Sequence, residues 1–431
     1  MLELATWNIP AAFHQQATAD SGDTAWLLAS AALVMLMTPG LAFFYGGLVG
    51  RKNVLSTVMH SFVIICVVGV QWVLWGYTLS FGPDAGGGII GNLEWLGLRM
   101  VGGDPSNVYA TTTPHLAFMM FQGMFAIITP ALISGAFAER MKFSTFLVFT
   151  IVWATLVYDP IAHWVWAFGE DGAASGWIGK MGALDFAGGT VVHINAGLAA
   201  LAAALMIKPR LGLGREPKEP HNIPFVVLGA ALLWFGWFGF NAGSAVAANA
   251  LAANAFVVTN TAAAAAGLSW MTMAWWKGGA PGAVGVASGV VAGLVAITPA
   301  SGFVGPMAAV IIGLGAGVFC YFAARMRTGW RNLDDALDVF AVHGIGGIWG
   351  AMATGLFATV AVNAAGADGL FNGGGTLILK QLAAVGATMA YSFIMTWVIL
   401  WVLNKLMGLR VKSEDEELGL DEALHGEIAY R

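Results

Sequence analysis

Long apolar stretches, separated by short polar segments, are the dominant pattern of this sequence. Eleven of them follow one another, at residues 24–48, 54–81, 115–139, 143–166, 187–207, 223–244, 251–276, 281–300, 303–324, 339–362 and 377–406. Each has roughly the length that an α-helix needs to cross the hydrocarbon core of a bilayer. A β-barrel would instead need short strands in which polar and apolar residues alternate. The pattern predicts an all-α integral membrane protein with eleven transmembrane helices.

The composition supports the same prediction. The chain is 58% hydrophobic and only 10% charged, whereas a soluble protein averages about 25% charged residues. Such a chain cannot cover a water-facing surface, so we expect membrane lipid to be part of its solvent. Small residues let membrane helices approach closely, and the glycine ladder Gly285, Gly289, Gly293 fits that use.

Charge and cysteine content exclude several other classes. The net charge is −5 and no basic patch is present, so we predict no nucleic-acid partner. The two cysteines, Cys66 and Cys320, lie inside apolar stretches, where a lone thiol behaves as a small hydrophobic group. We therefore predict neither a disulfide nor a cysteine metal ligand.

The distribution of Lys and Arg predicts the orientation in the membrane. If the N-terminus is outside, the inner loops and the C-terminal end carry sixteen positive charges, and only Arg99, Lys180 and Lys380 lie outside. Positive charges concentrate on the cytoplasmic side of membrane proteins. We therefore predict an extracytoplasmic N-terminus, a long outer loop at 82–114 and a cytoplasmic C-terminus.

The same pattern divides the chain into three parts. Residues 1–23 form an extracytoplasmic segment that lacks the basic start and long apolar core of a cleavable signal peptide. Residues 24–407 form the eleven-helix domain, and residues 408–431 form a cytoplasmic tail. With five helices in each half, helices 6 to 10 run opposite to helices 1 to 5, and helix 11 is left over. Inverted repeats of this kind are common in transporters.

One short echo supports the repeat. Val192-His193 followed by Gly197 in the fifth stretch matches Val342-His343 followed by Gly347 in the tenth. Because the two stretches enter the membrane from opposite sides, the two imidazoles would approach each other at mid-depth and line one shared path. The alternative is that each histidine only forms a hydrogen bond to a neighbouring helix.

Asp185 precedes His193 by eight residues, or about 12 Å of helix rise. It is an N-cap candidate for the fifth helix, and a carboxylate there would also make the outer mouth attractive to a cation. We expect its role to be indirect. A histidine metal site would need further His, Asp, Glu or Cys nearby in the same helices, and because these are absent we predict no metal.

Aromatic residues gather at a few places along the chain. Phe121 and Phe125 stand one turn apart, Trp166 ends the fourth helix, and Trp234, Trp237, Phe238 and Phe240 crowd the sixth. Most aromatic residues in membrane proteins pack in the interior or at the lipid interface. Position alone therefore does not separate packing from cation binding.

Several longer motifs resemble one family, the ammonium transporter (Amt/Mep/Rh) family, and in particular its bacterial Amt type. They occur in order from about residue 24 to the C-terminus: Thr38-Pro-Gly-Leu-Ala-Phe-Phe-Tyr-Gly-Gly47, Phe121-Gln-Gly-Met-Phe125, Gly135-Ala-Phe-Ala-Glu-Arg140, Asp185-Phe-Ala-Gly-Gly-Thr-Val-Val-His193-Ile-Asn195, Trp237-Phe-Gly-Phe240-Asn-Ala-Gly-Ser244, Ala292-Gly-Leu-Val-Ala-Ile-Thr-Pro-Ala300 and Asp338-Val-Phe-Ala-Val-His343-Gly. The departures are small. Asp159 before Pro160 is an ionisable residue that the resemblance does not place.

The resemblance implies a role for each group of candidate residues. An outer site that recruits ammonium would consist of Phe121, Trp166 and Ser244, shaped by Asp185. A stacked gate would consist of Phe125 and Phe240, and the pore would contain the paired imidazoles of His193 and His343. It further implies a multi-pass protein of the cytoplasmic membrane that works as a homotrimer with one pore per subunit, without a cofactor and without enzymatic activity.

An estimate of energies explains why such residues suit ammonium. Moving a small cation from water into a hydrocarbon-like medium costs on the order of 20 kcal/mol, and three aromatic or hydroxyl contacts return about 2 kcal/mol each. Removing one proton at pH 7 costs roughly 4.6 kcal/mol, with the Lys ammonium as a stand-in. We therefore expect ammonium to be captured as a cation, deprotonated, and passed as ammonia. The route of the proton stays open, although paired imidazoles could relay it.

The C-terminal tail, Gly408 to Tyr430, is acidic and by composition alone could be solvated and disordered. It resembles the family's regulatory tail, which packs on a neighbouring subunit and lets a PII signalling protein bind the inner face. On this resemblance His425, Gly426 and Tyr430 are regulatory candidates. Asp334, Asp335 and Asp338 begin the tenth helix on the same side, where they either cap the helix or help to dock the tail.

Three other functions compete with ammonium transport. The same fold could serve as an ammonium sensor, although no further signalling domain follows Tyr430 in this sequence. A membrane metalloenzyme would need the missing ligands. A Rh-like channel for ammonia or carbon dioxide is the third, and Trp166 together with Ser244 favours the ammonium-preferring type.

Overall fold

The computed structural model describes residues 19–214, 219–327 and 333–430. Residues 1–18 of the predicted N-terminal segment and Arg431 lie outside the described residues. Ten helical stretches in the described part are long and apolar enough to cross a membrane. They are Ser21–Leu48, Arg51–Phe81, His115–Phe137, Phe143–Trp166, Gly189–Ile207, Ile223–Gly243, Ala250–Trp276, Pro306–Met326, Phe340–Phe357 and Leu377–Leu406. Each coincides with a predicted stretch to within a few residues, so the prediction of a helical membrane protein is confirmed.

Most of these stretches are continuous α-helices. They are α1 (Ser21–Leu48), α4 (His115–Ile133, continued by the 3-10 turn η5, Ser134–Phe137), α9 (Ile223–Gly243), α10 (Ala250–Trp276), α12 (Pro306–Arg327) and α14 (Leu377–Leu406). Side-chain caps fix several starts. The Asp20 carboxylate accepts the backbone N–H of Asp23 at 2.8 Å, and Asn222 caps α9 through the N–H of Phe225 at 3.0 Å. These caps satisfy N–H groups that a helix start leaves without partners.

Four spans contain a π-helical turn. The second comprises η2 (Arg51–Asn53), α2 (Val54–Gln71), the π turn η3 (Trp72–Gly76) and α3 (Tyr77–Phe81). The fourth comprises α5 (Phe143–Trp153), the π turn η6 (Ala154–Tyr158) and α6 (Asp159–Trp166). The other two start with one: η7 (Gly189–Ile194) before α8 (Asn195–Ile207), and η8 (Phe340–Ile345) before α13 (Gly346–Phe357). Turns of this kind often lie at functional sites.

The eighth predicted stretch is shorter than expected. Its helix, α11 (Ala283–Ile297), has 15 residues, which is about 22 Å of rise against a hydrocarbon core of about 30 Å. Pro281 and Gly282 delay its start, and Pro299 has no N–H with which to continue it. The described residues therefore contain ten long spans and one short apolar helix at the eighth of the eleven predicted stretches.

The remaining elements are short. They are η4 (Leu96–Leu98), α7 (Trp177–Met181), η9 (Leu370–Asn372) and two tail helices, α15 (Ser413–Leu418) and α16 (Leu420–His425). The loop at 82–114 also contains an antiparallel pair of strands, β1 (Pro105–Ser106) and β2 (Ala110–Pro114). Apart from this small hairpin and three isolated β-bridges, the regular structure of the described residues is helical.

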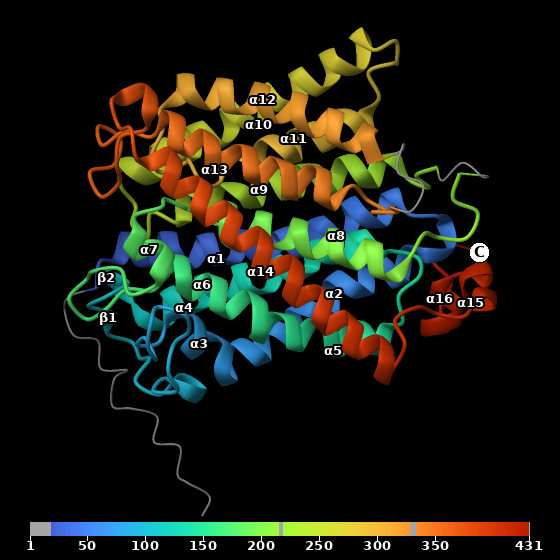
Figure 1. The fold of residues 1–431 in the computed structure, drawn as a ribbon, viewed down its shortest axis with the longest axis horizontal. Helices are drawn as coiled ribbons and strands as arrows, with labels where there is room; N and C mark the ends of the chain where they lie inside the picture. The colour runs from blue at the N-terminus through green and yellow to red at the C-terminus, as the bar shows by residue number, and fades with distance from the viewer. Residues whose placement is uncertain (1–18, 215–218, 328–332, 431) are drawn as a thin grey trace, which may run out of the picture.

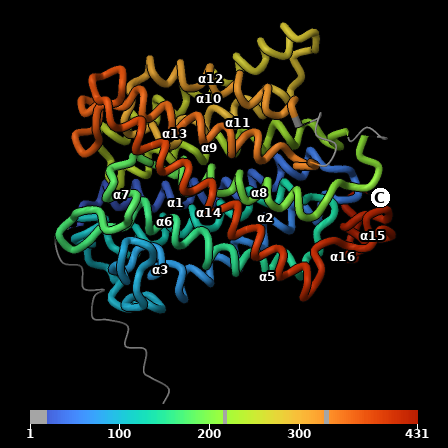
Figure 2. Tube along the Cα trace, in the orientation of Figure 1, coloured from blue at the N-terminus to red at the C-terminus, as the bar shows by residue number. Residues whose placement is uncertain are grey.

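The helices lie roughly side by side and form one bundle (Figure 1). The β1–β2 hairpin and α7 lie at one end of the bundle, and the tail helices α15 and α16 lie at the other. We call these the hairpin end and the tail end. The early helices and the later ones occupy different sides of the bundle, and α14 crosses the front of both (Figure 2), where it contacts α5, α8 and α13.

Candidate functional site

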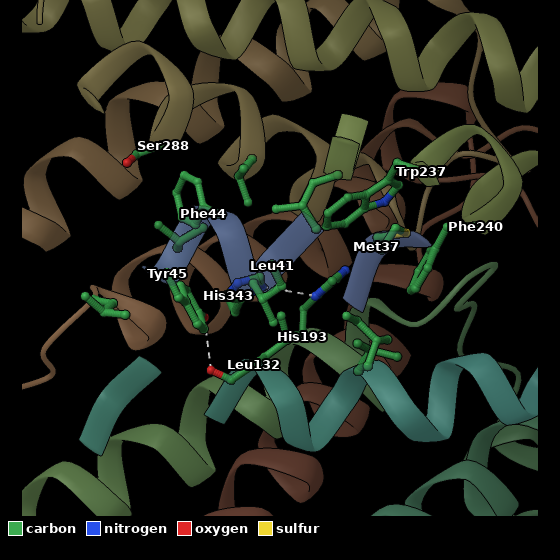
Figure 3. Close-up of a pocket in the computed structure, with 16 residues that line it drawn as sticks. Met37, Leu41, Phe44, Tyr45, Leu132, His193, Trp237, Phe240, Ser288 and His343 are labelled. Atoms are coloured by element: carbon green, nitrogen blue, oxygen red, sulfur yellow. Dashed lines mark hydrogen bonds between the residues drawn. The ribbon is translucent and has the colours of Figure 1, made fainter. Parts of the chain in front are cut away.

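The two Val-His pairs that the sequence repeats meet inside the bundle. His193 lies in η7 and His343 in η8, and both side chains are buried. Their Nδ1 atoms are 3.3 Å apart, and the rings lie at an angle of 26° with centroids 5.3 Å apart (Figure 3). One Nδ1–H can donate to the other Nδ1, so the pair can hold one shared proton. The buried Nε2 of His193 has no hydrogen-bond partner among the described residues.

Carboxylates organise the start of both π-helical turns. The Asp185 carboxylate accepts four backbone N–H groups at 2.7 to 3.1 Å, from Gly188, Gly189, Thr190 and Val191. Asp335 accepts the N–H of Phe340 at 2.7 Å. Each aspartate precedes its histidine by eight residues. We expected Asp335 to be only one of three capping candidates, and this equal spacing is the signal that would have paired it with Asp185.

Gly197 and Gly347, the glycines that follow the two histidines at the same spacing, lie where a larger side chain does not fit. A Cβ atom at Gly197 would lie 2.3 Å from the backbone nitrogen of Gly344, and one at Gly347 would lie 3.1 Å from the nitrogen of Ile194. At each position the helix that carries one histidine presses against the backbone beside the other histidine. The glycines therefore allow the two imidazoles to come into contact.

The imidazoles line a narrow apolar cavity. Its volume of about 20 Å³ is little more than one water-sized molecule needs. Trp237 stacks on His193 with ring centroids 5.3 Å apart and an angle of 24°, and its Nε1–H donates to Thr298 Oγ1 at 2.9 Å. Tyr45 also lines the cavity, and its hydroxyl donates to Leu132 O at 3.0 Å (Figure 3). Tyr45 lies in the motif Thr38 to Gly47, but the sequence alone does not predict a place for it in the site.

Two stacked phenylalanines lie next to His193. The rings of Phe125 and Phe240 have centroids 4.2 Å apart at an angle of 32°, and both side chains are buried. The His193 ring lies 6.0 Å from Phe240. On the other side, Trp166 meets Phe125 edge-on at 6.0 Å. The phenylalanine pair therefore lies between His193 and Trp166.

The remaining predicted recruitment residues surround this pair. Phe121 packs edge-on against Phe125 at 5.0 Å and is fully buried. Ser244 and Trp166 are partly exposed. The Ser244 hydroxyl donates to Phe240 O at 2.8 Å, and the Trp166 Nε1–H donates to Asp185 O at 2.8 Å. The Asp185 carboxylate already accepts four backbone N–H groups, and its backbone carbonyl accepts the Trp166 indole N–H.

The tail is ordered, and the alternative of a solvated, disordered segment is wrong for residues 408–430. The Asp421 carboxylate accepts the N–H of Ser56 at 2.8 Å. The Glu416 carboxylate pairs with Arg410 at 2.7 Å and accepts the N–H of Leu211 at 2.7 Å. The tail therefore packs on the start of α2 and on the loop after α8 of its own chain, at the tail end.

The three regulatory candidates all lie within this packed tail. The ring of His425 meets Phe143 edge-on at 4.9 Å. Gly426 ends α16 with a φ of 65°, a left-handed conformation that favours glycine. The Tyr430 hydroxyl lies 3.2 Å from His221 Nε2, and the guanidinium of Arg51 lies 5.3 Å from its ring centroid.

A buried ion-pair network lies beside the docked tail. Arg210 bonds to Glu139 and to Asp334, each at 2.8 Å. Burial alone would raise the pKa of Asp334, but its hydrogen bonds with Arg210 and the charges of Arg140 and Arg210 lower that pKa to about 2. Arg410 reaches the same place by donating to Pro209 O at 2.7 Å. The Asp334 carboxylate is therefore held by Arg210, next to the Pro209 carbonyl that Arg410 of the tail contacts.

In the described residues, no group of three or more His, Cys, Asp or Glu side chains is arranged to hold a metal ion.

Comparison with known proteins identifies what this chain is similar to. The model of the Ammonium Transporter Family matches residues 25–430. An ammonium transporter of Bacillus subtilis is 53% identical, with the alignment covering 95% of this chain and 98% of the relative. The crystal structure of Saccharomyces cerevisiae Mep2 superposes with a TM-score of 0.85 at 38% identity, covering 92% of each chain. A solved structure described as a sensor Amt protein superposes with a TM-score of 0.84 at 29% identity, covering 94% of this chain and 98% of the other.

Proposed function

Because the chain belongs to the ammonium transporter family, we propose that it captures ammonium as a cation, removes its proton and passes ammonia through the histidine cavity. It is a multi-pass protein of the cell membrane. The observation that carries the proposed mechanism is the contact of His193 with His343, 3.3 Å apart, in an apolar cavity next to the Phe125–Phe240 stack.

Recruitment uses the partly exposed residues outside the stack. The face of Trp166 attracts a cation through its ring quadrupole, a contact of about 2 kcal/mol at best. Ser244 adds a hydroxyl oxygen, which can accept an N–H of ammonium because its own hydrogen is donated to Phe240 O. Asp185 holds Trp166 through its backbone carbonyl and contributes no direct contact.

Passage requires the loss of one proton. A few contacts of about 2 kcal/mol do not offset the cost of moving a bare cation into the apolar cavity, which is on the order of 20 kcal/mol. Deprotonation at pH 7 costs roughly 4.6 kcal/mol and leaves a neutral molecule of about the size of water. The cavity of about 20 Å³ has room for one such molecule. Potassium has no proton to lose and is therefore rejected.

Beyond the Phe125–Phe240 pair, the imidazoles of His193 and His343 offer ammonia hydrogen bonds in place of those that it made to water. The Nε2 atom of His193 is buried without a partner in the described structure and can donate to or accept from an ammonia molecule. Whether the proton returns outward or crosses through the pair is decided by electrical measurement. A current driven by ammonium supports relay by the imidazoles, and electrically silent uptake opposes it.

The assembly and regulation that we propose follow the family resemblance. Each subunit of a homotrimer would carry its own pore, and a PII signalling protein would bind at the cytoplasmic face next to the tail at 408–431. The packing of the tail on α2 and on the loop after α8 supports a regulated surface at that end. Residues 24–407 would form the transport domain, and residues 1–23 an extracytoplasmic segment.

Two other functions of this fold are compatible with the same helices. The fold similarity to a sensor Amt protein does not separate sensing from transport, but the 53% identity to an ammonium transporter favours transport over the 29% identity to the sensor. A Rh-like channel for ammonia or carbon dioxide would not need a recruitment site, so the partly exposed Trp166 and Ser244 favour capture of the cation.

Purified full-length protein in liposomes tests the proposal. We expect uptake of ammonium and methylammonium but no potassium conductance. In a variant with Phe125→Ala and Phe240→Ala, the selectivity for ammonium should fall by about tenfold, because lost aromatic contacts of 1 to 2 kcal/mol correspond to about that factor. Potassium conductance equal to that of ammonium in the unchanged protein would refute the mechanism. Unchanged selectivity in a folded double variant would refute the gate.

A further inference from the structure

One buried carboxylic acid in the membrane-spanning part has no place in the mechanism above. Asp159 begins α6 and is fully buried. Its oxygens accept hydrogen bonds from Gln71 Nε2 at 2.9 Å and from Ser80 Oγ at 3.2 Å. Both partners belong to the second span, so this side chain ties the second span to the fourth. Ionisable groups in membrane spans are costly and usually functional.

The Asp159 bridge joins the irregular turns of the two spans. The π turn η3 starts directly after Gln71, and the π turn η6 ends directly before Asp159. A second contact links the same turns, because the Trp75 Nε1–H donates to Thr155 Oγ1 at 2.9 Å. A π turn is an irregular turn within a helix. The side-chain contacts of Asp159 and Trp75 hold the two irregular turns against each other.

The first residue of η3 connects this bridge to the gate. Trp72 is buried, and its Nε1–H donates to Met119 O in α4 at 3.0 Å. A Cβ atom at Gly123 would lie 2.8 Å from Cδ1 of Trp72. Gly123 stands midway between Phe121 and Phe125, so the indole lies against the backbone that carries both rings. Trp72 therefore contacts the segment of α4 from which both rings project.

We propose that Asp159 is a positioning residue for the gate: through Gln71 and Trp72 it holds the α4 segment that carries Phe121 and Phe125, and so sets which small cations are admitted. This inference rests on the gate role proposed above. The bridge needs one hydrogen-bond partner for the Gln71 amide and one for the Ser80 hydroxyl, which can donate or accept, and it does not need a charge. An asparagine can replace it, because its oxygen accepts from Gln71 and its NH₂ group donates to the Ser80 hydroxyl.

The test measures uptake of ammonium and methylammonium by purified full-length protein in liposomes. Asp159→Ala should lower the ratio of ammonium to methylammonium transport by about tenfold or more, since a misplacement of about 1 Å can cost up to about a hundredfold. Asp159→Asn should keep the ratio within about twofold of the original. A ratio unchanged in folded Asp159→Ala, or lowered equally in Asp159→Asn, overturns the proposal.

A matched control separates positioning from general stability. Thr396→Val removes another buried bond of the fourth span, from Trp153 Nε1 to Thr396 Oγ1 at 2.9 Å, which links α5 to α14. We expect a lower melting temperature and an unchanged transport ratio. If this control shifts the ratio as Asp159→Ala does, the effect is general loosening and the proposal fails.

Two more variants complete the test. If Asp159→Ala does not fold, Trp72→Phe keeps a ring against Gly123 but loses the bond to Met119 O, and it should also lower the ratio; an unchanged ratio overturns the proposal. The variant with Phe125→Ala and Phe240→Ala separates the two claims. If it lowers the ratio and Asp159→Ala does not, only the positioning role is wrong. If it leaves the ratio unchanged, the gate itself is wrong.

Discussion

At the scale of single residues, small side chains determine whether the histidines can meet. The spacing Val-His-x-x-x-Gly occurs twice in the sequence, and from it the approach of His193 and His343 could be predicted. The reason for the glycine could not, because the close contact of Gly197 with Gly344 depends on how two distant helices cross. The hydrogen bond from the N–H of Phe340 to Asp335 could not be predicted either. The sequence shows only that Asp335 precedes His343 by eight residues, as Asp185 precedes His193.

This geometry predicts the effect of one added methyl group. Gly197→Ala places a Cβ atom 2.3 Å from the nitrogen of Gly344, so the helices must separate, and we expect a loss of about 1 to 3 kcal/mol in stability together with slower ammonium uptake. Gly386→Ala is the matched control, because Gly386 lies in α14 with no atom within 4 Å of the new Cβ. Thermal unfolding in detergent measures both. Equal melting temperatures for the two variants would contradict the predicted steric contact.

At the scale of elements, hydrophobic stretches predicted the helices well and their irregularities poorly. Span positions follow from length and apolar composition, which the sequence states directly. The π turns at η3, η6, η7 and η8 do not, because one extra residue in a turn leaves the apolar pattern unchanged. The shortness of α11 could have been anticipated from Pro281 and Pro299. The hairpin β1–β2 could not, since two residues of strand are below the length at which alternation is visible.

The tail helix α16 should respond to pH. Burial against Phe143 lowers the pKa of His425, while Asp421 and Glu427 act in the opposite direction, and His60 lies close enough to interact electrostatically. A histidine whose pKa is lower in the docked tail binds protons more tightly when undocked. Docking should therefore be strongest above pH 6.5, the usual value, and weaken by at most about tenfold per pH unit below it.

Hydrogen exchange of the backbone amides at 413–426, corrected for the intrinsic pH dependence, measures this docking. We expect faster exchange at pH 5.5 than at pH 7.5. His425→Phe keeps a ring against Phe143 but cannot bind a proton, so its exchange should not depend on pH in this range. A pH dependence that persists in His425→Phe would assign the effect to other groups.

At the scale of the whole molecule, the two ends of the helix bundle differ both in structure and in charge. The hairpin and the tail lie at opposite ends of the bundle (Figure 1). The buried network of Arg210, Glu139 and Asp334 lies at the tail end, where the sequence places most of the positive charge. The orientation relative to the membrane is predicted from that charge bias, because the arrangement of the helices does not by itself say which end faces the cytoplasm. It stays a prediction until labelling tests it.

Cysteine labelling in intact cells decides the orientation. In a chain with Cys66→Ala and Cys320→Ala, a single Ala173→Cys lies in an exposed loop at the hairpin end, and a single Ala280→Cys lies in the exposed loop between α10 and α11. A membrane-impermeant maleimide should label the first from outside and the second only after the cells are opened. The reverse pattern would put the sixteen positive charges outside, against the bias that membrane insertion imposes. The proposed recruitment site at Trp166 would then face the cytoplasm, and the direction of capture would have to be inverted with it.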